Sequence, residues 1–494
     1  MQTIRTACFV ILVLLGVRIV YIMVQNGKAY EAMAISQQKR TVTVKNIRGK
    51  ILDKSGTELT DTALEDRYLL SDGTLADLNK NAKFKFKVPK REAQTARHLI
   101  GYTSFEGEGL CGIEKQFDFL LKNNGKIALS YMADATGAPI DSFNILNQED
   151  NSTSVSLTID GNIQKIAEEV MDKYIKKGAV VILDCKSFDV AAMVSRPDYN
   201  LKKLKDYSKS ENGELLNRAL MSYNAGSVFK IITASAALEK NTQYTKKEFN
   251  CDGTFKLNDG TTFGCHNANG HGKIDFSKAF ALSCNCSFDE TGLELGGTEI
   301  VNMAKRFGMG QNTLDLNLNE SAGNLPQKNE YTNGDVLNLA IGQGEILITP
   351  LQCAVITATI ANGGIRQRAN VVAGYTDQNG KYHNLKSRQS FKVIKRKTAE
   401  DISEMMRDCV VDGTATGAKN SSVNIAGKTG SAETGWVQNG KALVHGWFCG
   451  YFPYEKPRYA AVVFSEGGES GAGSCVAPFV EIAEKINEIY PFKQ

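Results

Sequence analysis

Residues 226–230 read GSVFK, and this short stretch decides how the rest of the chain is interpreted. Gly226 permits a sharp turn into a helix, and a helix would place Ser227 and Lys230 on one face within a single turn. The surrounding residues are apolar, and burial lowers the pKa of a lysine because it penalises the charged form. A neutral amine could accept the proton of Ser227, so the stretch predicts a serine nucleophile beside a lysine base.

Two further clusters follow in the same part of the chain. Residues 283–285 read SCN, and Ser283 and Asn285 can reach one cleft where a turn breaks the helix. Residues 427–431 read GKTGS, and glycines around a cation and a hydroxyl suit a sheet edge that another backbone approaches closely. Each pattern has chance copies elsewhere in the chain. Their order within one domain, however, resembles a known three-part signature of enzymes with a serine nucleophile, S-x-x-K, S-D-N and K-T-G, with Cys284 in place of the Asp. The three clusters together predict serine acyl transfer.

The elements expected around these clusters indicate an α+β domain. Residues 177–194 form two apolar runs around a polar turn, which is typical of a β-hairpin. Residues 444–452 and 459–465 predict two more strands, and residues 477–490 predict an amphipathic helix. Helices are expected between these ends, over residues 228–238, 274–288 and 334–362. This order predicts an antiparallel sheet whose first and last segments meet, with helices on both faces.

An apolar stretch near the N-terminus predicts a membrane anchor. Residues 7–24 are apolar apart from Arg18, and at about 1.5 Å per residue they span about 27 Å of helix. A cleaved signal peptide is the alternative, because residues 32–34 have a small-x-small form. The apolar core is longer than a signal core, and Ala34 lies ten positions beyond it. We therefore expect a single-pass membrane protein. Charge does not settle its orientation, and the remainder of the chain could still be outside, since long domains translocate largely regardless of charge.

Composition excludes several classes of protein. The chain has 494 residues, 42% of them hydrophobic, and a net charge of +4, which argues against disorder and against a nucleic-acid partner. This length predicts several domains. We expect a cytoplasmic tip and transmembrane anchor over residues 1–25, a small α+β juxtamembrane module over 26–151, and a catalytic domain over 152–494. In the module, alternating Lys and Phe at 83–87 fit a half-exposed strand.

The eleven cysteines are odd in number and irregular in spacing, so they do not form a disulfide framework. Cys251 and Cys265 flank a glycine-rich loop and are the best candidates for one disulfide. Residue types that bind zinc gather in this region: Cys251, Cys265, His266, His271, Cys284 and Cys286. However, no CxxC pair is present, and Cys-x-Cys is not a usual zinc spacing. We expect no metal and no organic cofactor.

Together with these clusters, further segments make the chain resemble a class B penicillin-binding protein, a membrane-anchored peptidoglycan D,D-transpeptidase. These segments are RGKILDKSG at 48–56, GIE at 112–114, LTID at 157–160, IGQG at 341–344 and HGWF at 445–448. The resemblance implies a transpeptidase (penicillin-binding) domain over 152–494 with a five-stranded antiparallel sheet between helical layers. It also implies that the module before it is dimerisation- or pedestal-like. Ala225 stands where the family usually has Pro, and Ser431 where it commonly has Thr.

The resemblance implies a catalytic role for four residues. Ser227 attacks the carbonyl of a D-Ala-D-Ala donor peptide to form an acyl-enzyme. Lys230 accepts the proton of Ser227, and Ser283 relays a proton to the departing D-alanine. Lys428 supplies positive potential to the site.

Four further residues are implied to bind the substrate. Asn285 hydrogen-bonds the donor peptide, and Thr429 binds its terminal carboxylate. Gly430 and Ser431 are also implied to bind the substrate, and the backbone N–H groups of Ser227 and Ser431 would form the oxyanion hole.

The implied partners are peptidoglycan stem peptides, β-lactams that acylate Ser227, and a membrane glycan polymerase. Three alternatives remain open at this point. A D,D-carboxypeptidase would pass the acyl group to water, and a β-lactamase would deacylate rapidly. A non-catalytic scaffold of cell-wall assembly is the alternative of another class.

Overall fold

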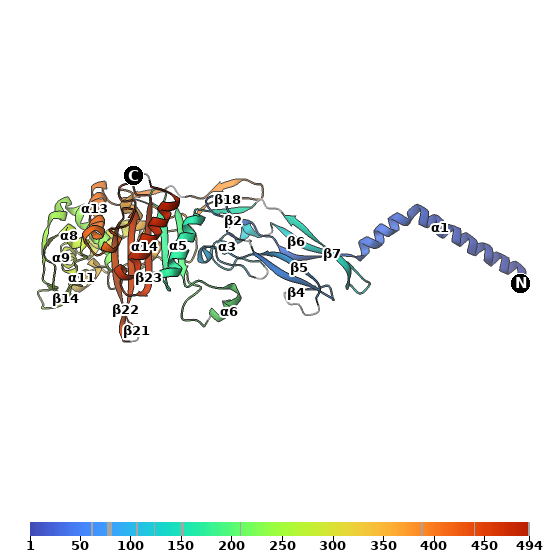
Figure 1. Cartoon of the computed structure of the whole chain (residues 1–494), viewed down its shortest axis with the longest axis horizontal. Coiled ribbons are helices and arrows are strands. Elements are labelled where there is room, and N and C mark those ends of the chain that lie inside the picture. Colours follow the sequence, from blue (N-terminus) through green and yellow to red (C-terminus); the bar gives the residue numbers. More distant parts are fainter. Residues whose placement is uncertain are drawn as a thin grey trace.

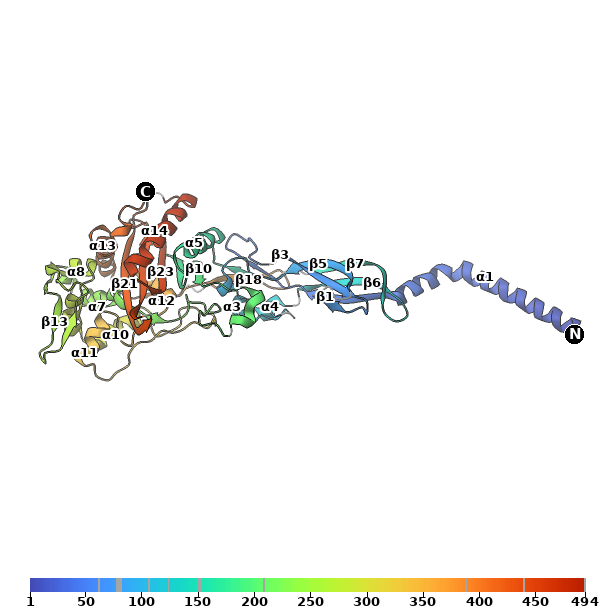
Figure 2. The same ribbon diagram turned by 60° about the horizontal axis from the view of Figure 1, so that its bottom comes forward.

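The computed structural model describes residues 1–60, 63–76, 82–104, 107–122, 124–149, 153–207, 209–386, 389–438 and 440–492. The molecule is elongated, with α1 (Gln2–Gln38) projecting from one end and the helix-rich body at the other (Figures 1 and 2). No residue of α1 is buried, and the helix is long and apolar enough to cross a membrane. The apolar stretch at 7–24 lies within this helix, in agreement with a single-pass anchor.

Two small sheets follow α1. One has the strand order β1 (Lys39–Asn46), β6 (Gly125–Ala133) and β7 (Pro139–Glu149); the other has the order β4 (Leu75–Ala76), β3 (Ala63–Leu70) and β5 (Ala82–Lys90). Along β5 the burial of side chains alternates, as the Lys/Phe pattern predicts, and Phe86 and Val88 pack on Leu69 and Leu129. Three short helices complete this part: α2 (Arg97–Ile100), α3 (Gly112–Gln116) and α4 (Asp118–Leu121).

A buried cluster of charged side chains joins the segments that connect these two sheets to the short helices α3 and α4. Glu114 is 1% exposed and accepts hydrogen bonds from Arg48 Nε at 3.0 Å and Arg91 Nε at 2.7 Å. Arg48 also pairs with Asp118 at 2.8 Å, and Arg91 donates to the carbonyl oxygen of Gly49 at 2.9 Å. Two of the segments that carry the family resemblance, 48–56 and 112–114, therefore meet in this cluster.

A four-stranded sheet joins the two halves of the molecule. β2 (Lys50–Leu52) pairs in parallel with β8 (Ser154–Leu157). On its other side β8 pairs with β18 (Val372–Thr376), which pairs in turn with β19 (Tyr382–Asn384). The domain boundary expected between residues 151 and 152 lies outside the described residues.

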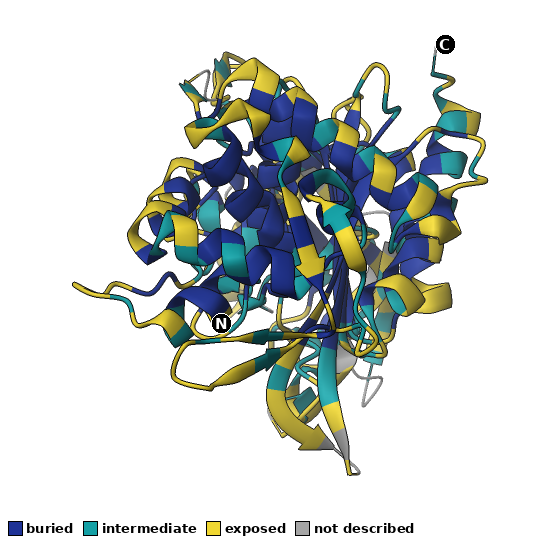
Figure 3. Ribbon diagram, turned by 90° about the vertical axis from the view of Figure 1, so that its left-hand side faces the viewer, coloured by how far each residue is buried: buried dark blue, intermediate teal, exposed yellow. Residues whose placement is uncertain are grey.

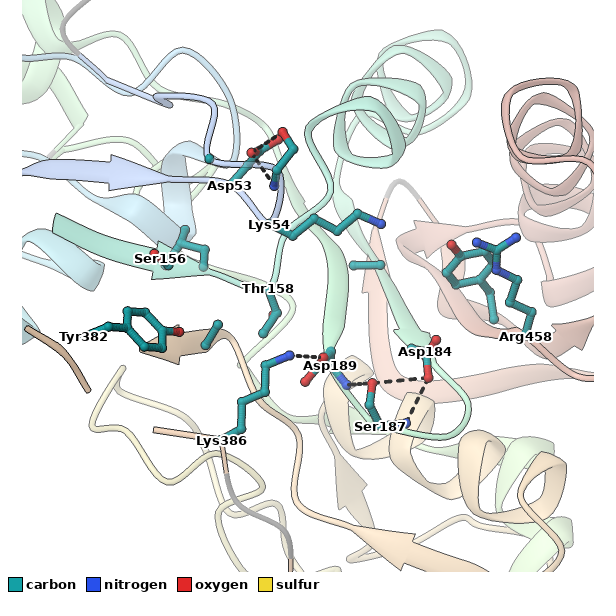
Figure 4. Close-up of a pocket in the computed structure, with 16 residues that line it drawn as sticks. Asp53, Lys54, Ser156, Thr158, Asp184, Ser187, Asp189, Tyr382, Lys386 and Arg458 are labelled. Carbon is teal, nitrogen blue, oxygen red and sulfur yellow. Dashed lines mark hydrogen bonds and ion pairs between the residues drawn. The ribbon is translucent and has the colours of Figure 1, made fainter. Parts of the chain in front are cut away.

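Beside this sheet lies a pocket of about 490 Å³ with both signs of charge (Figure 4). Lys386 reaches Asp189 at 2.5 Å across it. None of the predicted site residues lines this pocket.

The main sheet has five strands, all antiparallel. Their order is β10 (Val190–Arg196), β9 (Gly178–Asp184), β23 (Tyr459–Gly468), β22 (Lys441–Phe452) and β21 (Ala426–Gln438). β9, from the start of this unit, pairs with β23, from its end. The predicted meeting of first and last segments is confirmed, and so is the five-stranded antiparallel sheet.

Helices cover both faces of this sheet because successive side chains of its central strands point in opposite directions. Val180 and Val463 pack with α5 (Gly161–Tyr174) and α14 (Gly471–Ile489), which lie on the same face in Figure 1. Val181 and Val462 pack on the other face in one core with the helices of the second layer. These are α7 (Lys230–Lys240), α8 (Phe276–Ala281), α9 (Asn285–Leu295), α10 (Gly297–Arg306), α11 (Asn333–Ala340), α12 (Pro350–Ala361) and α13 (Arg396–Asp412). Figure 3 shows buried residues between the exposed outer faces.

Two of the expected helices are each interrupted. The segment 274–288 begins with the last two residues of β15 (Gly272–Asp275) and continues as two helices, α8 and α9, with a break at Ser283. The segment 334–362 is α11, β16 (Leu347–Ile348) and α12. Gly342 and Gly344 have φ of +76° and +73°, which ends α11, and a capping box at Thr349 starts α12.

Short strands and turns complete the helical side. They are β11 (Tyr223–Asn224), β12 (Glu248–Cys251), β13 (Thr254–Lys256), β14 (Thr262–Gly264), β15 (Gly272–Asp275), β17 (Ile365–Gln367), β20 (Ser390–Lys392), α6 (Leu204–Tyr207) and the 3₁₀ turns η1 (Leu201–Lys203), η2 (Gly226–Phe229), η3 (Thr242–Lys246) and η4 (Thr416–Ala418).

Candidate active site

Ser227 lies in the turn η2, which leads directly into α7. Gly226 has φ of +57° and donates its N–H to the carbonyl oxygen of Gly342 at 2.8 Å. A Cβ at Gly226 would lie only 2.7 Å from the carbonyl oxygen of Ser431. A glycine is therefore required for the turn and for its close approach to β21. Ser227 is half-buried, whereas the residues on either side of it are buried.

Lys230 is fully buried, and its amine contacts the second cluster. Nζ donates hydrogen bonds to the carbonyl oxygen of Ser283 and to Oδ1 of Asn285, each at 2.7 Å, and lies 3.3 Å from Oγ of Ser283. Burial, followed by the positive charge of Lys428, lowers the pKa of Lys230 to about 7. The prediction of a lysine with a lowered pKa is confirmed.

Ser283 and Asn285 reach Lys230 because the helix breaks between them. α8 ends at Ala281, Ser283 takes the left-handed φ of +57°, and α9 begins at Asn285. This geometry directs both the carbonyl and the hydroxyl of Ser283 toward Lys230. Nδ2 of Asn285 donates to the carbonyl oxygen of Gly264 at 3.3 Å, at the end of β14.

The third cluster lies on β21, the edge strand of the main sheet beside η2. Lys428 is fully buried: its Nζ donates to the carbonyl oxygen of Thr429 at 3.1 Å and lies 5.7 Å from the ring centre of Phe280. Burial lowers the pKa of Lys428. A Cβ at Gly430 would lie 2.9 Å from Cγ1 of Val228, so glycine again allows strand and turn to touch.

The remaining groups of β21 face neighbouring loops. Oγ1 of Thr429 is 2.6 Å from Oγ1 of Thr414, and Oγ of Ser431 accepts a hydrogen bond from the N–H of Gly471 at 3.1 Å. Ser431 is exposed. The structure therefore brings all eight predicted residues to the junction of η2, the α8–α9 break and β21.

Two polar groups at this junction were not predicted from the sequence. Thr414 follows α13 and reaches Thr429 only through the tertiary fold, so no local pattern identifies it. Asp289 lies four residues after Asn285 on α9, a spacing that could have identified it. Burial raises the pKa of Asp289 to about 7, and neither carboxylate oxygen has a hydrogen-bond partner among the described residues.

A cluster of cysteine and histidine side chains adjoins the junction. Donor atoms of Cys251, Cys265, His271 and Cys284 lie within 4.8 Å of one another, so these residues could hold a metal ion. Cys251 and Cys265, the best candidates for one disulfide, are both free thiols. Sγ of Cys265 faces Nδ1 of His271 at 3.6 Å within this shared cluster.

Known proteins resemble the chain over this same region. Residues 178–488 match the family described as penicillin binding protein transpeptidase domain. Stage V sporulation protein D of Bacillus subtilis is 29% identical over 401 residues, covering 78% of this chain and 61% of that protein. Peptidoglycan D,D-transpeptidase MrdA of Acinetobacter baumannii is 27% identical over 475 residues, covering 83% of this chain and 69% of that protein. The chain thus spans less than two thirds of the Bacillus protein.

A solved structure agrees with these sequence matches. It is the D,D-transpeptidase domain of a peptidoglycan glycosyltransferase from Eggerthella lenta, with a TM-score of 0.70 and 25% identity. The match covers 90% of this chain and 99% of that one. The family match takes in more than half of the chain and contains all eight site residues, so the chain belongs to the penicillin-binding protein transpeptidase family.

Proposed function

We propose that this protein is a peptidoglycan D,D-transpeptidase of class B, which cross-links stem peptides through an acyl-enzyme at Ser227. Relatives named as D,D-transpeptidases support the reaction, among them the Acinetobacter protein. The observation that carries the proposal is the environment of Lys230, a fully buried amine with a pKa of about 7 three residues from a half-buried serine.

The contacts of Lys230 suit a proton acceptor. A neutral amine has two N–H donors and one lone pair. Its two short hydrogen bonds, to the carbonyl oxygen of Ser283 and to Oδ1 of Asn285, use both donors. The lone pair is then free to take the proton of the Ser227 hydroxyl as this oxygen attacks the penultimate D-alanine carbonyl.

The groups around the nucleophile suit the later steps of acyl transfer. The backbone N–H groups of Ser227 and Ser431 would stabilise the tetrahedral oxyanion, and loss of one such donor typically costs about 10²–10³ in rate. Oγ of Ser283, 3.3 Å from Lys230 Nζ, would carry the proton to the leaving D-alanine. An amine of a second stem peptide then takes the acyl group and frees Ser227.

Charge at the edge strand suits a substrate that ends in a carboxylate. The buried cation of Lys428 provides positive potential, and the hydroxyl of Thr429 would bind the carboxylate of the donor. Asn285 and the edge formed by Gly430 and Ser431 would hold the donor backbone. A β-lactam would occupy the same positions and remain attached to the serine.

The remaining expectations complete the proposal. Residues 1–25 are a cytoplasmic tip and anchor, residues 26–151 a juxtamembrane module, and residues 152–494 an extracytoplasmic transpeptidase domain. A membrane glycan polymerase is the proposed partner, because cross-linking requires newly made glycan strands.

Mass spectrometry of the detergent-purified chain after incubation with benzylpenicillin tests the proposal. A stable adduct should map to Ser227 and disappear in Ser227→Ala, whereas an adduct at another serine would refute the assignment. Product analysis with and without an acceptor amine separates transpeptidation from carboxypeptidation. Rapid turnover of nitrocefin would instead favour a β-lactamase.

A further inference from the structure

We propose that Cys251, Cys265, His271 and Cys284 form a metal site that takes one zinc ion. Each offers one donor atom, and the four atoms lie within 4.8 Å of one another. A tetrahedral zinc ion with Zn–S bonds of about 2.3 Å and a Zn–N bond of about 2.0–2.1 Å holds sulfur and nitrogen about 3.5–3.6 Å apart. Sγ of Cys265 and Nδ1 of His271 are 3.6 Å apart. This pair of donors already has the separation that the ion requires.

The backbone brings the donors together from separate turns. Cys251 ends β12, Cys265 follows β14, and His271 precedes β15. The N–H of His271 donates to the carbonyl oxygen of Cys251 at 3.0 Å, and that of Cys265 to Gly253 at 2.9 Å. The sequence spacing resembles no zinc motif because the donors come from three separate places, the end of β12, the β14–β15 connection and the α8–α9 break.

Phe249 packs β12 into the main core, but the β13–β14 side of the region has little other core to stabilise it. Its buried cluster consists of Ala279 and four cysteines, with Phe255 and Ile274 partly buried against it. The two hairpins β12–β15 and β13–β14 are two-stranded sheets, and isolated two-stranded hairpins are marginally stable. A structural zinc ion supplies folding free energy in such small units. Three thiolates and one imidazole form a donor set that suits zinc.

Zinc binding would also position the active site, and this part of the inference rests on the proposed function. Cys284 lies between Ser283 and Asn285, which contact Lys230. Asn285 also donates to Gly264, the neighbour of Cys265. An ion bound by both cysteines would therefore fix the α8–α9 break against β14. The three thiols release their protons to solvent when the ion binds, and the metal ligands act as positioning residues.

Elemental analysis of the full chain, purified in detergent without chelator, tests the site directly. We expect about one zinc per chain, and at least a fivefold loss of zinc in His271→Asn and Cys265→Ser. His266→Asn is the matched control, because Nδ1 of His266 lies 3.9 Å from Cys265 but outside the group of four. Cys475→Ser is a control for loss of a buried thiol elsewhere. Both controls should keep their zinc.

Cobalt substitution of the wild-type chain avoids variants that fail to fold. Thiolate-to-cobalt charge transfer and the visible bands of a tetrahedral ion are expected. Zinc-free wild-type protein that shows neither feature after cobalt addition would overturn the proposal.

The two proposals fail in distinguishable ways. If the chain contains no zinc and binds none, and benzylpenicillin acylates Ser227 at the same rate with and without added zinc, the metal site is wrong and the proposed function stands. If the chain binds zinc through these four residues but is never acylated, the metal site stands and the proposed function is wrong. If both hold, removal of zinc by a chelator should slow acylation at least tenfold.

Discussion

Acidification should stop acylation of Ser227 by protonating Lys230. The pKa of Lys230 is lowered to about 7, first by burial and then by the charge of Lys428. The amine accepts a proton only in its neutral form, so the rate should rise with pH through this value and then level off. The neutral fraction is about one half at pH 7, about 9% at pH 6 and about 1% at pH 5. Acylation at pH 5 should therefore be about 100-fold slower than on the plateau above pH 8.

Stopped-flow measurement of acylation by a fluorescent penicillin, from pH 5 to 9 at constant ionic strength, gives this profile. A lysine with an ordinary pKa of about 10.5 would produce no plateau, and the rate would still rise about tenfold between pH 8 and 9. Lys428→Gln removes a charge that lowers the pKa of Lys230, so its acid limb should move to higher pH. A rate that is constant from pH 5 to 7 in a protein that remains folded would refute the role of Lys230.

Three further predictions follow from other contacts. Gly226→Ala places a Cβ 2.7 Å from the carbonyl oxygen of Ser431 and should slow acylation at least about 100-fold. Gly380→Ala changes a glycine with φ of +76° that has no atom near its Cβ, so this control variant should be acylated at the normal rate. An equal loss of acylation rate in the two glycine variants would count against the close approach of the turn at Gly226 to Ser431. Glu114→Gln leaves buried arginines undercompensated and should destabilise the chain by about 3–5 kcal/mol in urea unfolding. Glu65→Gln removes a partly exposed ion pair with Lys45 and should lower the free energy of unfolding by less than about 1 kcal/mol. A similar loss of stability in the Glu65 and Glu114 variants would contradict the importance of burial. Hydrogen peroxide should oxidise the zinc thiolates to a disulfide and release the ion to a chromogenic chelator, and unchanged zinc content after thiol oxidation would oppose the proposed ligand set.

Local patterns predicted most of the main sheet. The hairpin at 177–194 and the strands at 444–452 and 459–465 consist of contiguous apolar residues, and the observed strands match them within a few residues. Their pairing followed from the order of elements, since helices between two sets of strands leave the first and last strands free to meet.

A turn at residues 283–285 was expected from the site pattern, but no local signal placed the end of the preceding helix. Residues 274–288 carry a helical pattern and contain neither proline nor glycine, so no residue within the segment marks the end of α8 at Ala281. The left-handed φ of Ser283 is adopted by few non-glycine residues and is held by tertiary contacts. The amine of Lys230 supplies one of these contacts.

Contacts between turns that are distant in the sequence could not be predicted from local patterns either. The contact of Thr414 with Thr429 and the grouping of His271 with three cysteines depend on the folded backbone. The sequence therefore predicted which residue types carry the chemistry at the nucleophile, while neighbours contributed by loops emerged only from the structure.

The elongated shape has a consequence for where bonds are made. α1 and the helical body that holds α7 lie at opposite ends of the molecule (Figures 1 and 2). If α1 lies in the bilayer and the body lies outside it, as proposed above, the small β-sheets between them act as a spacer that sets the height of the active site above the lipid. For the proposed transpeptidase, only those glycan strands that pass at this height would come within reach of Ser227, so the length of the spacer would select the layer of the wall that is cross-linked.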